Sequence, residues 1–145
     1  MAEGKVSSIL FVCAHNAIRS PMARALLDQR FPGRFYTQSA GVAPGERDPF
    51  VDAILGEVGI TLGDHQPRAL EDLEDLSFDL AITLSPEAHH RTLELTRTQS
   101  LAVEYWPTFD PSGAVGARDQ ILAAYRELRT RLTERIQRRF GTRND

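Results

Sequence analysis

The stretch ILFVCAHNAIRSPMARALL, residues 9–27, joins a short apolar run to a helical pattern through a polar loop. Its first four residues are typical of a buried strand, and Pro21 suits the first turn of the helix that follows. Cys13, the only cysteine of the chain, ends the apolar run and stands six residues before Arg19. A strand, a loop and a helix in this order form the repeating unit of a parallel sheet, so the stretch indicates an α/β fold.

The rest of the 145-residue chain repeats this alternation. Apolar or β-prone runs predict strands at 8–12, 35–39, 80–84 and 102–105. Helical spacing and caps predict helices at 21–29, from Pro49 to a stop at Gly59, from Pro86 after a Ser85 cap, and at 117–140. The apolar spacing of the first two helices is predicted from Met22, Ala25, Leu26 and Gln29 and from Val51, Ile54, Leu55 and Val58. We therefore predict a single domain over residues 1–145 with a small four-stranded parallel sheet.

Composition excludes several classes of protein. The formal net charge of −3 gives no general attraction to nucleic acid or to an anionic membrane, so we expect neither as a partner. The first apolar run is too short to span a bilayer, and no signal-peptide cleavage site follows it. One cysteine cannot form an intramolecular disulfide or a multi-cysteine zinc site, and a reducing cytoplasm is the natural setting for it.

The predicted C-terminal helix carries an apolar stripe and many arginines. Seven arginines lie between Arg126 and Arg143. We interpret them as the solvated face of a helix that covers one side of the sheet, with a patch for an acidic partner as the alternative. The stripe is predicted to consist of Ile121, Tyr125, Leu128, Leu132 and Ile136.

The loop after the first strand is predicted to bind an anion. The carboxyl end of a parallel strand and the amino end of the next helix meet in one crevice, where ligands bind. Backbone N–H groups of a tight loop and of the helix start form an anion site there without any net protein charge. The predicted substrate-binding residues are Ala14, His15, Asn16, Ala17, Ile18 and Ser20.

Residue types within this loop suit nucleophilic chemistry. Positive potential favours thiolate over thiol, which predicts that Cys13 is a nucleophile. The planar guanidinium of Arg19 can bind two oxygens of a phosphate-like oxyanion. Asn16 tolerates the left-handed backbone that lets N–H groups converge, and Ser20 can donate its hydroxyl to the thiolate. The alternative is that Cys13 is a buried structural cysteine.

Expulsion of an alkoxide or phenoxide requires an acid that protonates it. The chain offers two Asp-Pro pairs. Asp48 with Pro49 opens a predicted helix and suits an ordinary N-cap. Asp110 with Pro111 follows the last strand in a turn-rich loop, at the same sheet edge as Cys13. We therefore predict Asp110 as the general acid, with a simple turn former as the alternative.

The pattern Cys-x5-Arg-Ser followed by SPMARALL resembles the low-molecular-weight protein tyrosine phosphatase family, which includes the cysteine-dependent bacterial arsenate reductases. The similarity extends through residues 39–60 (SAGVAPGERDPFVDAILGEVGI), 78–85 (FDLAITLS) and 104–112 (EYWPTFDPS). The resemblance implies a three-layer α/β/α sandwich and phosphoryl transfer through a phosphocysteine, without a metal or cofactor. It also implies Cys13 as nucleophile, Arg19 as oxyanion clamp and Asp110 as general acid.

Three positions depart from the family pattern. His15 stands where the family usually has glycine, and we interpret it as tolerated or specificity-tuning. Ile18 replaces the second loop cysteine that is common in the phosphatases, so a protective disulfide with Cys13 is impossible. After Asp110 the sequence PSGAVG lacks the tyrosines of many family members.

Two adjacent histidines and three aromatic residues are interpreted as structural and not as catalytic residues. His89 and His90 are adjacent on a predicted helix and point apart, so they are interpreted as surface residues and not as joint metal ligands. Phe50, Trp106 and Phe109 are expected to pack in the core, although each could supply apolar surface to a substrate.

Three functions follow from these residues. The first is a phosphatase acting through Cys13 on phosphomonoesters, foremost protein phosphotyrosine, with greatest turnover at mildly acidic pH. The second is an arsenate reductase, which here needs an external thiol or a glutaredoxin-like partner because the chain has no further cysteine. The third is a noncatalytic module that binds oxyanions or phosphoproteins, although binding alone would not need a nucleophile and an acid.

Overall fold

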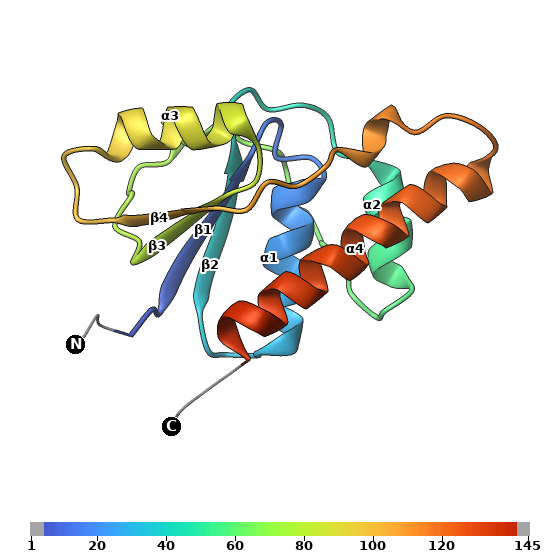
Figure 1. Cartoon of the computed structure of the whole chain (residues 1–145), viewed down its shortest axis with the longest axis horizontal. Coiled ribbons are helices and arrows are strands. Elements are labelled where there is room, and N and C mark those ends of the chain that lie inside the picture. The colour runs from blue at the N-terminus through green and yellow to red at the C-terminus, as the bar shows by residue number, and fades with distance from the viewer. Residues whose placement is uncertain (1–4, 142–145) are drawn as a thin grey trace.

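The computed structural model describes residues 5–141 and contains one four-stranded parallel sheet. The strands lie in the order β2-β1-β3-β4, so the first strand of the chain is central (Figure 1). Cys13 pairs with Gly41, and Val12 pairs with Thr83. The carboxyl ends of the strands therefore meet at one edge. Their bounds are β1 (Ser8–Cys13), β2 (Tyr36–Gly41), β3 (Leu80–Thr83) and β4 (Ala102–Tyr105).

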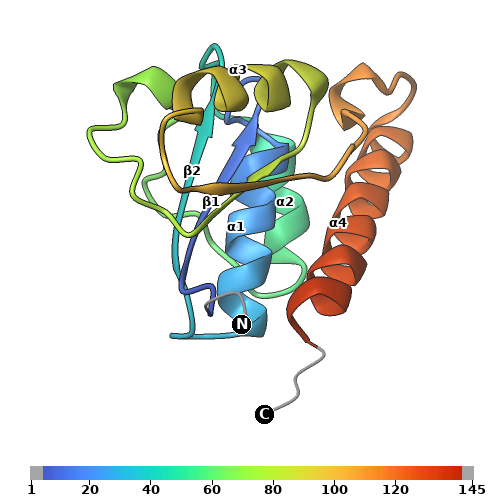
Figure 2. The same cartoon turned by 60° about the vertical axis from the view of Figure 1, so that its left-hand side comes forward.

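Helices cover both faces of the sheet, which confirms the expected three-layer α/β/α arrangement. Figures 1 and 2 show α3 on one face and α1, α2 and α4 on the other. Among the described residues, no helix is long and apolar enough to cross a membrane. The bounds are α1 (Arg19–Arg30), α2 (Pro49–Gly56), α3 (Pro86–Thr96) and α4 (Arg118–Phe140), with short 3₁₀ helices η1 (Leu70–Asp72) and η2 (Pro111–Gly113).

Both faces of the central strand are buried. Ile9 and Phe11 belong to the core shared with α1, α2 and α4, whereas Leu10 and Val12 belong to the core under α3. All four are fully buried. This two-sided burial explains why β1 is apolar at successive positions instead of alternating apolar and polar residues.

The predicted caps are present. The Asp48 carboxylate accepts a hydrogen bond from the Phe50 backbone N–H at 2.8 Å, and the Ser85 hydroxyl accepts one from the Ala88 N–H at 3.2 Å. After α2, Gly59 has φ 79° and the Ile60 N–H bonds back to the Leu55 carbonyl at 2.9 Å. This is the glycine-terminated turn expected at that position.

Some predicted helix faces were wrong in part. Val58 lies in the turn after α2 and is 39% exposed, because the helix ends at Gly56. Gln29, predicted to lie on the inner face of α1, is exposed. In α4 the predicted stripe is buried except at Ile121, which is only partly covered, while Leu122 is buried beside it.

Two predictions for individual side chains were also wrong. His89 is not a plain surface residue: its Nδ1 lies 2.9 Å from the Thr83 hydroxyl, and its ring stacks on Tyr105 with centroids 4.7 Å apart. Phe109 is 39% exposed and does not pack in the core. Trp106 is buried, as expected.

Candidate active site

The loop after β1 is pressed against the end of β2. Cys13 and Gly41 are register partners at the ends of these strands. A Cβ atom on Gly41 would lie 2.6 Å from the backbone nitrogen of Asn16, closer than real Cβ atoms come. The Val42 N–H also donates to the Cys13 carbonyl at 3.1 Å, and the Ala43 N–H to the Ala14 carbonyl at 2.9 Å. The backbone of β2 and its extension therefore fix the path of the loop.

Asn16 adopts the predicted left-handed backbone with φ 55°, the only such value among non-glycine residues at positions 5–141. Its side chain is fully buried. The amide nitrogen donates to the hydroxyls of Ser20 and Ser39, each at 2.9 Å, and the amide oxygen accepts from the Arg68 N–H at 3.0 Å. Because every polar atom of this amide is satisfied, Asn16 holds the loop in one conformation.

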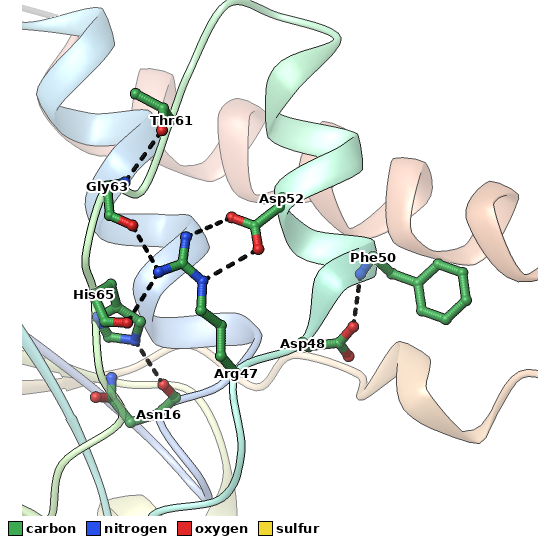
Figure 3. Close-up of polar contacts among 8 residues, drawn as sticks. All are labelled: Asn16, Arg47, Asp48, Phe50, Asp52, Thr61, Gly63 and His65. Carbon is green, nitrogen blue, oxygen red and sulfur yellow. Dashed lines mark hydrogen bonds and ion pairs between the residues drawn. The ribbon is translucent and has the colours of Figure 1, made fainter.

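A segment far along the chain supports Asn16 from outside (Figure 3). The His65 Nε2 lies 3.0 Å from the Asn16 carbonyl oxygen. Burial is the largest influence on the pKa of His65 and lowers it. The hydrogen bond to Asn16 raises this pKa, whereas the nearby charges of the arginines at positions 47, 24 and 68 lower it further, and the net shift is downward. The neutral ring therefore donates Nε2–H to this carbonyl.

Arg47 fixes the loop that carries His65. Its guanidinium donates to the Gly63 carbonyl at 2.7 Å and to the His65 carbonyl at 3.1 Å, while its Nη2 pairs with Asp52 at 2.8 Å (Figure 3). Asp52 belongs to the first turn of α2. The start of α2 is thus connected, through Arg47 and His65, to the backbone of the loop after β1.

The sulfur of Cys13 lies against the start of α1. Sγ is 3.0 Å from the Ser20 hydroxyl oxygen and accepts a hydrogen bond from the Ser20 N–H at 3.4 Å. Ile18, the N-cap of α1, gives no side-chain hydrogen bond to the helix, and the first turn carries no acidic residue. This helix start is therefore open to an anion next to the sulfur.

Arg19, the first residue of α1, is 8% exposed. Its Nη1 donates to the Thr108 carbonyl at 2.9 Å, which anchors the guanidinium to the segment between β4 and η2. The remaining donors of the fork stay available for oxyanion oxygens.

A hollow of about 40 Å³ opens over the sulfur. One wall comes from the loop and the first residue of α1, and the other from the start of η2. The hollow is lined by Cys13, His15, Ala17, Ile18, Arg19, Asp110 and Ser112. The structure thus brings the predicted nucleophile, the predicted clamp and the predicted acid together, although 97 residues of sequence separate the first from the last.

The electrostatic environment of this hollow acts on Asp110. Burial, the largest single influence, raises the pKa of Asp110, but hydrogen bonds from Ser112 and the charges of Arg19 and His15 together outweigh it. The pKa of this carboxyl therefore lies below its usual value. Glu87, in the first turn of α3, has its pKa lowered by hydrogen bonds from its own N–H and the Ser85 hydroxyl and by the same two charges.

A family model described as low molecular weight phosphotyrosine protein phosphatase matches residues 8–137. The chain belongs to this family. The match spans all four strands and almost all of α4, and so includes every residue that lines the hollow over Cys13.

Relatives within the low molecular weight phosphatase family have two different activities. A glutaredoxin arsenate reductase from Synechocystis sp. is 26% identical over 132 residues, covering 91% of this chain and 95% of that protein. The low molecular weight protein-tyrosine-phosphatase Etp from Escherichia coli K12 is 36% identical over 91 residues, 60% of each chain. The crystal structure of arsenate reductase from Archaeoglobus fulgidus has a TM-score of 0.71 and 28% identity, covering 92% and 99% of the two chains.

The predicted residues of this phosphatase-family site divide into two groups. His15, Ala17 and Ile18 line the hollow, whereas Asn16 and Ser20 are fully buried behind it and hold the loop and the sulfur. His15 Nδ1 lies 2.8 Å from the Ala43 carbonyl oxygen, so the imidazole is fixed at the rim. Ala14 contributes a backbone carbonyl that ties the loop to Ala43 and does not line the hollow.

No phenylalanine, tyrosine or tryptophan side chain lines the hollow within residues 5–141. Phe50 packs on Tyr125 with ring centroids 5.3 Å apart, and Trp106 is buried. The loop sequence after Asp110, which lacks the tyrosines of many family members, therefore leaves the mouth without an aromatic wall, as the sequence indicated in part.

Sequence reasoning missed the residues that support the site without touching it: Ser39, His65, Arg68 and Thr108. His65, Arg68 and Thr108 each make a hydrogen bond between a side chain and a backbone atom, with a partner residue 49 to 89 positions away. No periodicity or spacing indicates such bonds. The only local feature that could have drawn attention to His65 and Arg68 is the segment GDHQPR, residues 63–68, which contains a glycine, a proline and a single histidine.

Proposed function

We propose that this protein is a cysteine-dependent phosphatase that hydrolyses phosphomonoesters, foremost protein phosphotyrosine, through a phosphocysteine. One observation carries the proposal: Cys13, Arg19 and Asp110 line the same small hollow at the open start of α1. Phosphoryl transfer through a covalent intermediate requires a nucleophile, a cation that binds two phosphate oxygens, and a carboxylic acid. All three groups are needed around one space of the size of an oxyanion.

In the proposed reaction, the Cys13 thiolate attacks phosphorus in line with the leaving oxygen. The P–O bond to the leaving group breaks as the S–P bond forms, and Asp110 gives its proton to the departing oxygen. Arg19 and the N–H groups of the loop stabilise the charge on the three equatorial oxygens. Water then attacks the phosphocysteine, Asp110 accepts its proton, and inorganic phosphate leaves with the thiolate restored.

The substrate class follows from the same site. A phosphorylated protein or a small phosphomonoester supplies the required tetrahedral group, and the Etp relative, named as a protein-tyrosine-phosphatase, supports the choice of phosphotyrosine. The nucleophile must stay reduced, and we therefore also propose the cytoplasm as the compartment in which the protein works.

Arsenate reduction is the second candidate. The relative that is similar over nearly the whole chain is named a glutaredoxin arsenate reductase, and the hollow lacks an aromatic wall. In this reaction Cys13 would displace water from arsenate, and two external thiols would supply two electrons that reduce As(V) to As(III) and would leave as a disulfide. A glutathione or glutaredoxin-like partner has to supply them because Cys13 is the only cysteine.

The deciding experiment compares two products from one preparation. Phosphate release from p-nitrophenyl phosphate and from a phosphotyrosine peptide is measured beside arsenite formation from arsenate with glutathione and glutaredoxin. We expect phosphate release to dominate. If arsenite forms and no phosphate is released, the protein is an arsenate reductase and not a phosphatase. If neither product forms at any pH, oxyanion binding without catalysis is the function that remains.

Cys13→Ala and Cys13→Ser serve as controls in both assays. Each should abolish turnover, because neither a methyl group nor an ordinary hydroxyl replaces the thiolate. Phosphate release that survives either change would reject a covalent intermediate on this sulfur. Quenching the wild-type reaction in acid and detecting a phosphorylated Cys13 by mass spectrometry gives direct evidence for the intermediate.

A further inference from the structure

A groove of about 480 Å³ runs between α4 and the segment that joins β4 to η2. Trp106, Thr108 and Phe109 contribute one side of it. Three arginines of α4, Arg131, Arg135 and Arg138, contribute the other side, together with Glu127 and Glu134. Figures 1 and 2 show η2 close beside the first half of α4. We call this space the arginine groove.

The arginines of α4 do not form one uniform solvated face. Arg126 and Arg129 both bind Glu57 at the end of α2, at 2.7 and 2.9 Å, and Arg139 binds Glu104 at 2.8 Å. These three therefore fasten α4 to the rest of the molecule. Arg131, Arg135 and Arg138 follow a spacing of four and three residues, which places them on one side of the helix, facing the groove. Arg118, at the start of the helix, lies over Phe50 instead.

Two of the groove arginines lie over aromatic rings. The Arg131 guanidinium lies 5.6 Å from the centroid of Phe109, and the Arg135 guanidinium lies 5.0 Å from that of Trp106. A guanidinium over a ring face can still donate N–H hydrogen bonds to a carboxylate. Among residues 5–141, Arg131 pairs with Glu127, whereas Arg135 and Arg138 form no ion pair.

The arginine groove adjoins the hollow over Cys13. Thr108 and Phe109 line the groove, and the next residue, Asp110, lines the hollow. The Thr108 carbonyl also holds Arg19, so the same segment forms a wall of both spaces. Phe109, which lines the groove and directly precedes Asp110, is 39% exposed. A bound peptide with its phosphate over Cys13 therefore needs only a few extended residues to reach Arg135 and Arg138.

We propose that the arginine groove binds acidic residues flanking the phosphorylated residue of a protein substrate. This inference rests on the proposed phosphatase function and adds its substrate class: phosphoproteins in which aspartate or glutamate lies a few residues from the phosphorylated side chain. Arg135 and Arg138 bind the carboxylates, and Phe109 contacts the intervening peptide.

An acidic peptide suits the groove better than a nucleic acid does. The faces of Trp106 and Phe109 that stack on guanidinium groups are not available to bases, and stacking is what single strands require. Glu127 and Glu134 in the same walls repel a continuous row of phosphates, whereas separate carboxylates can bind between them. The net charge of −3 also works against general binding of polyanions.

The test compares kcat/KM for two phosphotyrosine peptides of equal length, one flanked by aspartate and glutamate and one by serine and glutamine. Acidic residues are placed on either side of the phosphotyrosine in separate peptides. Wild-type protein should prefer an acidic peptide by about five- to tenfold at low salt, as two exposed ion pairs allow. Arg135→Glu/Arg138→Glu should abolish this preference and leave p-nitrophenyl phosphate hydrolysis unchanged.

The matched control is Lys5→Glu/Arg97→Glu, which changes the net charge equally at positions outside the groove. It should keep the preference. Arg138→Glu alone, at an exposed position, should lower the preference even if the double variant misfolds. The inference would be overturned if the groove and control variants lost the preference for the acidic peptide equally, or if the groove variants kept it. Neither result would contradict the proposed phosphatase function.

Two further outcomes are decisive. Absence of p-nitrophenyl phosphate hydrolysis by wild-type protein would remove the proposed function and this inference with it. Competition against the acidic peptide by a single-stranded RNA oligomer, lost in Arg135→Glu/Arg138→Glu, would show that the groove binds nucleic acid instead.

Discussion

At the level of single residues, the proposed reaction requires Asp110 to supply a proton from an environment that favours its ionised form. Burial raises the pKa of this carboxyl, but hydrogen bonds from Ser112 and the charges of Arg19 and His15 together hold it below the usual value. A bound phosphate dianion offsets the positive charges and raises the pKa again. The acid form is lost as pH rises through this pKa, so activity should be greatest at acidic pH and fall towards neutrality.

Asp110→Asn should remove this falling limb of the pH profile and lower kcat by about 10²- to 10⁴-fold for esters with poor leaving groups. The loss should be much smaller for p-nitrophenyl phosphate, whose leaving group needs little protonation. Asparagine can still cap η2, so the fold is expected to persist. Steady-state rates for a series of aryl and alkyl phosphates between pH 4 and 8 measure both effects.

Ser112→Ala provides the matched control for that experiment. Losing the hydroxyl hydrogen bond should raise the pKa of Asp110 and move the falling limb to higher pH. If the wild-type protein, Asp110→Asn and Ser112→Ala had the same pH profile, the fall in activity with rising pH would belong to another group, such as the substrate phosphate.

Asn16 combines a costly backbone conformation with three side-chain hydrogen bonds. Asn16→Ala should lower the free energy of unfolding by about 3–5 kcal/mol, from lost hydrogen bonds and left-handed strain together. Asn16→Gly loses the same bonds but tolerates positive φ, so it should be about 1 kcal/mol more stable than the alanine variant. Urea denaturation measures both values, and equal stability of the two would show that φ at this position costs nothing.

At the level of elements, α2 and α4 are joined through Glu57. Its carboxylate accepts hydrogen bonds from Arg126 and Arg129, and these hydrogen bonds, together with the charges of both arginines, lower its pKa to about 2. A carboxyl with a lowered folded-state pKa stabilises the fold above its unfolded value of 4.5 and loses that contribution as pH falls through the folded value.

Glu57→Gln should therefore reduce the free energy of unfolding by an amount that is constant above about pH 5 and disappears towards pH 2. Denaturation curves collected at several pH values give this difference. Glu127→Gln is the control, since Glu127 pairs with Arg131 inside α4 and joins no second element. A pH dependence as large in the control would contradict a role specific to the α2–α4 contact.

The sequence could predict elements wherever one local signal sufficed. β4 has its predicted bounds, and Asp48, Ser85 and Gly59 cap or close their helices as expected. The errors concern where a helix ends, as at Val58, and which side of a helix is buried, as at Ile121. Burial of Ile121 depends on the angle at which α4 packs, and periodicity does not contain that angle.

At the level of the whole molecule, the single cysteine decides how the site responds to oxidants. Oxidation of Cys13 to a sulfenic acid cannot continue to an internal disulfide, because no second thiol exists in the chain. Hydrogen peroxide should therefore inactivate the protein with poor recovery by dithiothreitol, and mass spectra should show sulfinic and sulfonic acids on Cys13. Saturating phosphate should slow the loss by covering the sulfur.

Ile18→Cys is the informative comparison, because Ile18 lines the same hollow as Cys13. A thiol at this position should trap the oxidised sulfur as a disulfide and make inactivation reversible by dithiothreitol. Full recovery of the wild-type protein after prolonged oxidation would show that Cys13 does not advance along the oxidation series.

The candidate site was predictable as far as its chemistry was local. Cys13, Asn16, Arg19 and Ser20 lie within eight residues, and their types indicate an oxyanion loop without any tertiary information. Asp110 followed from the rule that parallel strands end at one edge. The arginine groove and the His65 contact could not be predicted, since both depend on side chains brought together by packing of distant segments.

The close approach of Gly41 to the backbone of Asn16 also restricts which residues can occupy position 41 as the sequence evolves. Any side chain at position 41 would push the loop after β1 away from the sheet, so descendants of this protein can vary the mouth and the groove but must retain that glycine. Gly45 is less restricted: a Cβ there would meet only the His15 side chain at 3.2 Å, so changes at positions 15 and 45 are expected to be inherited together.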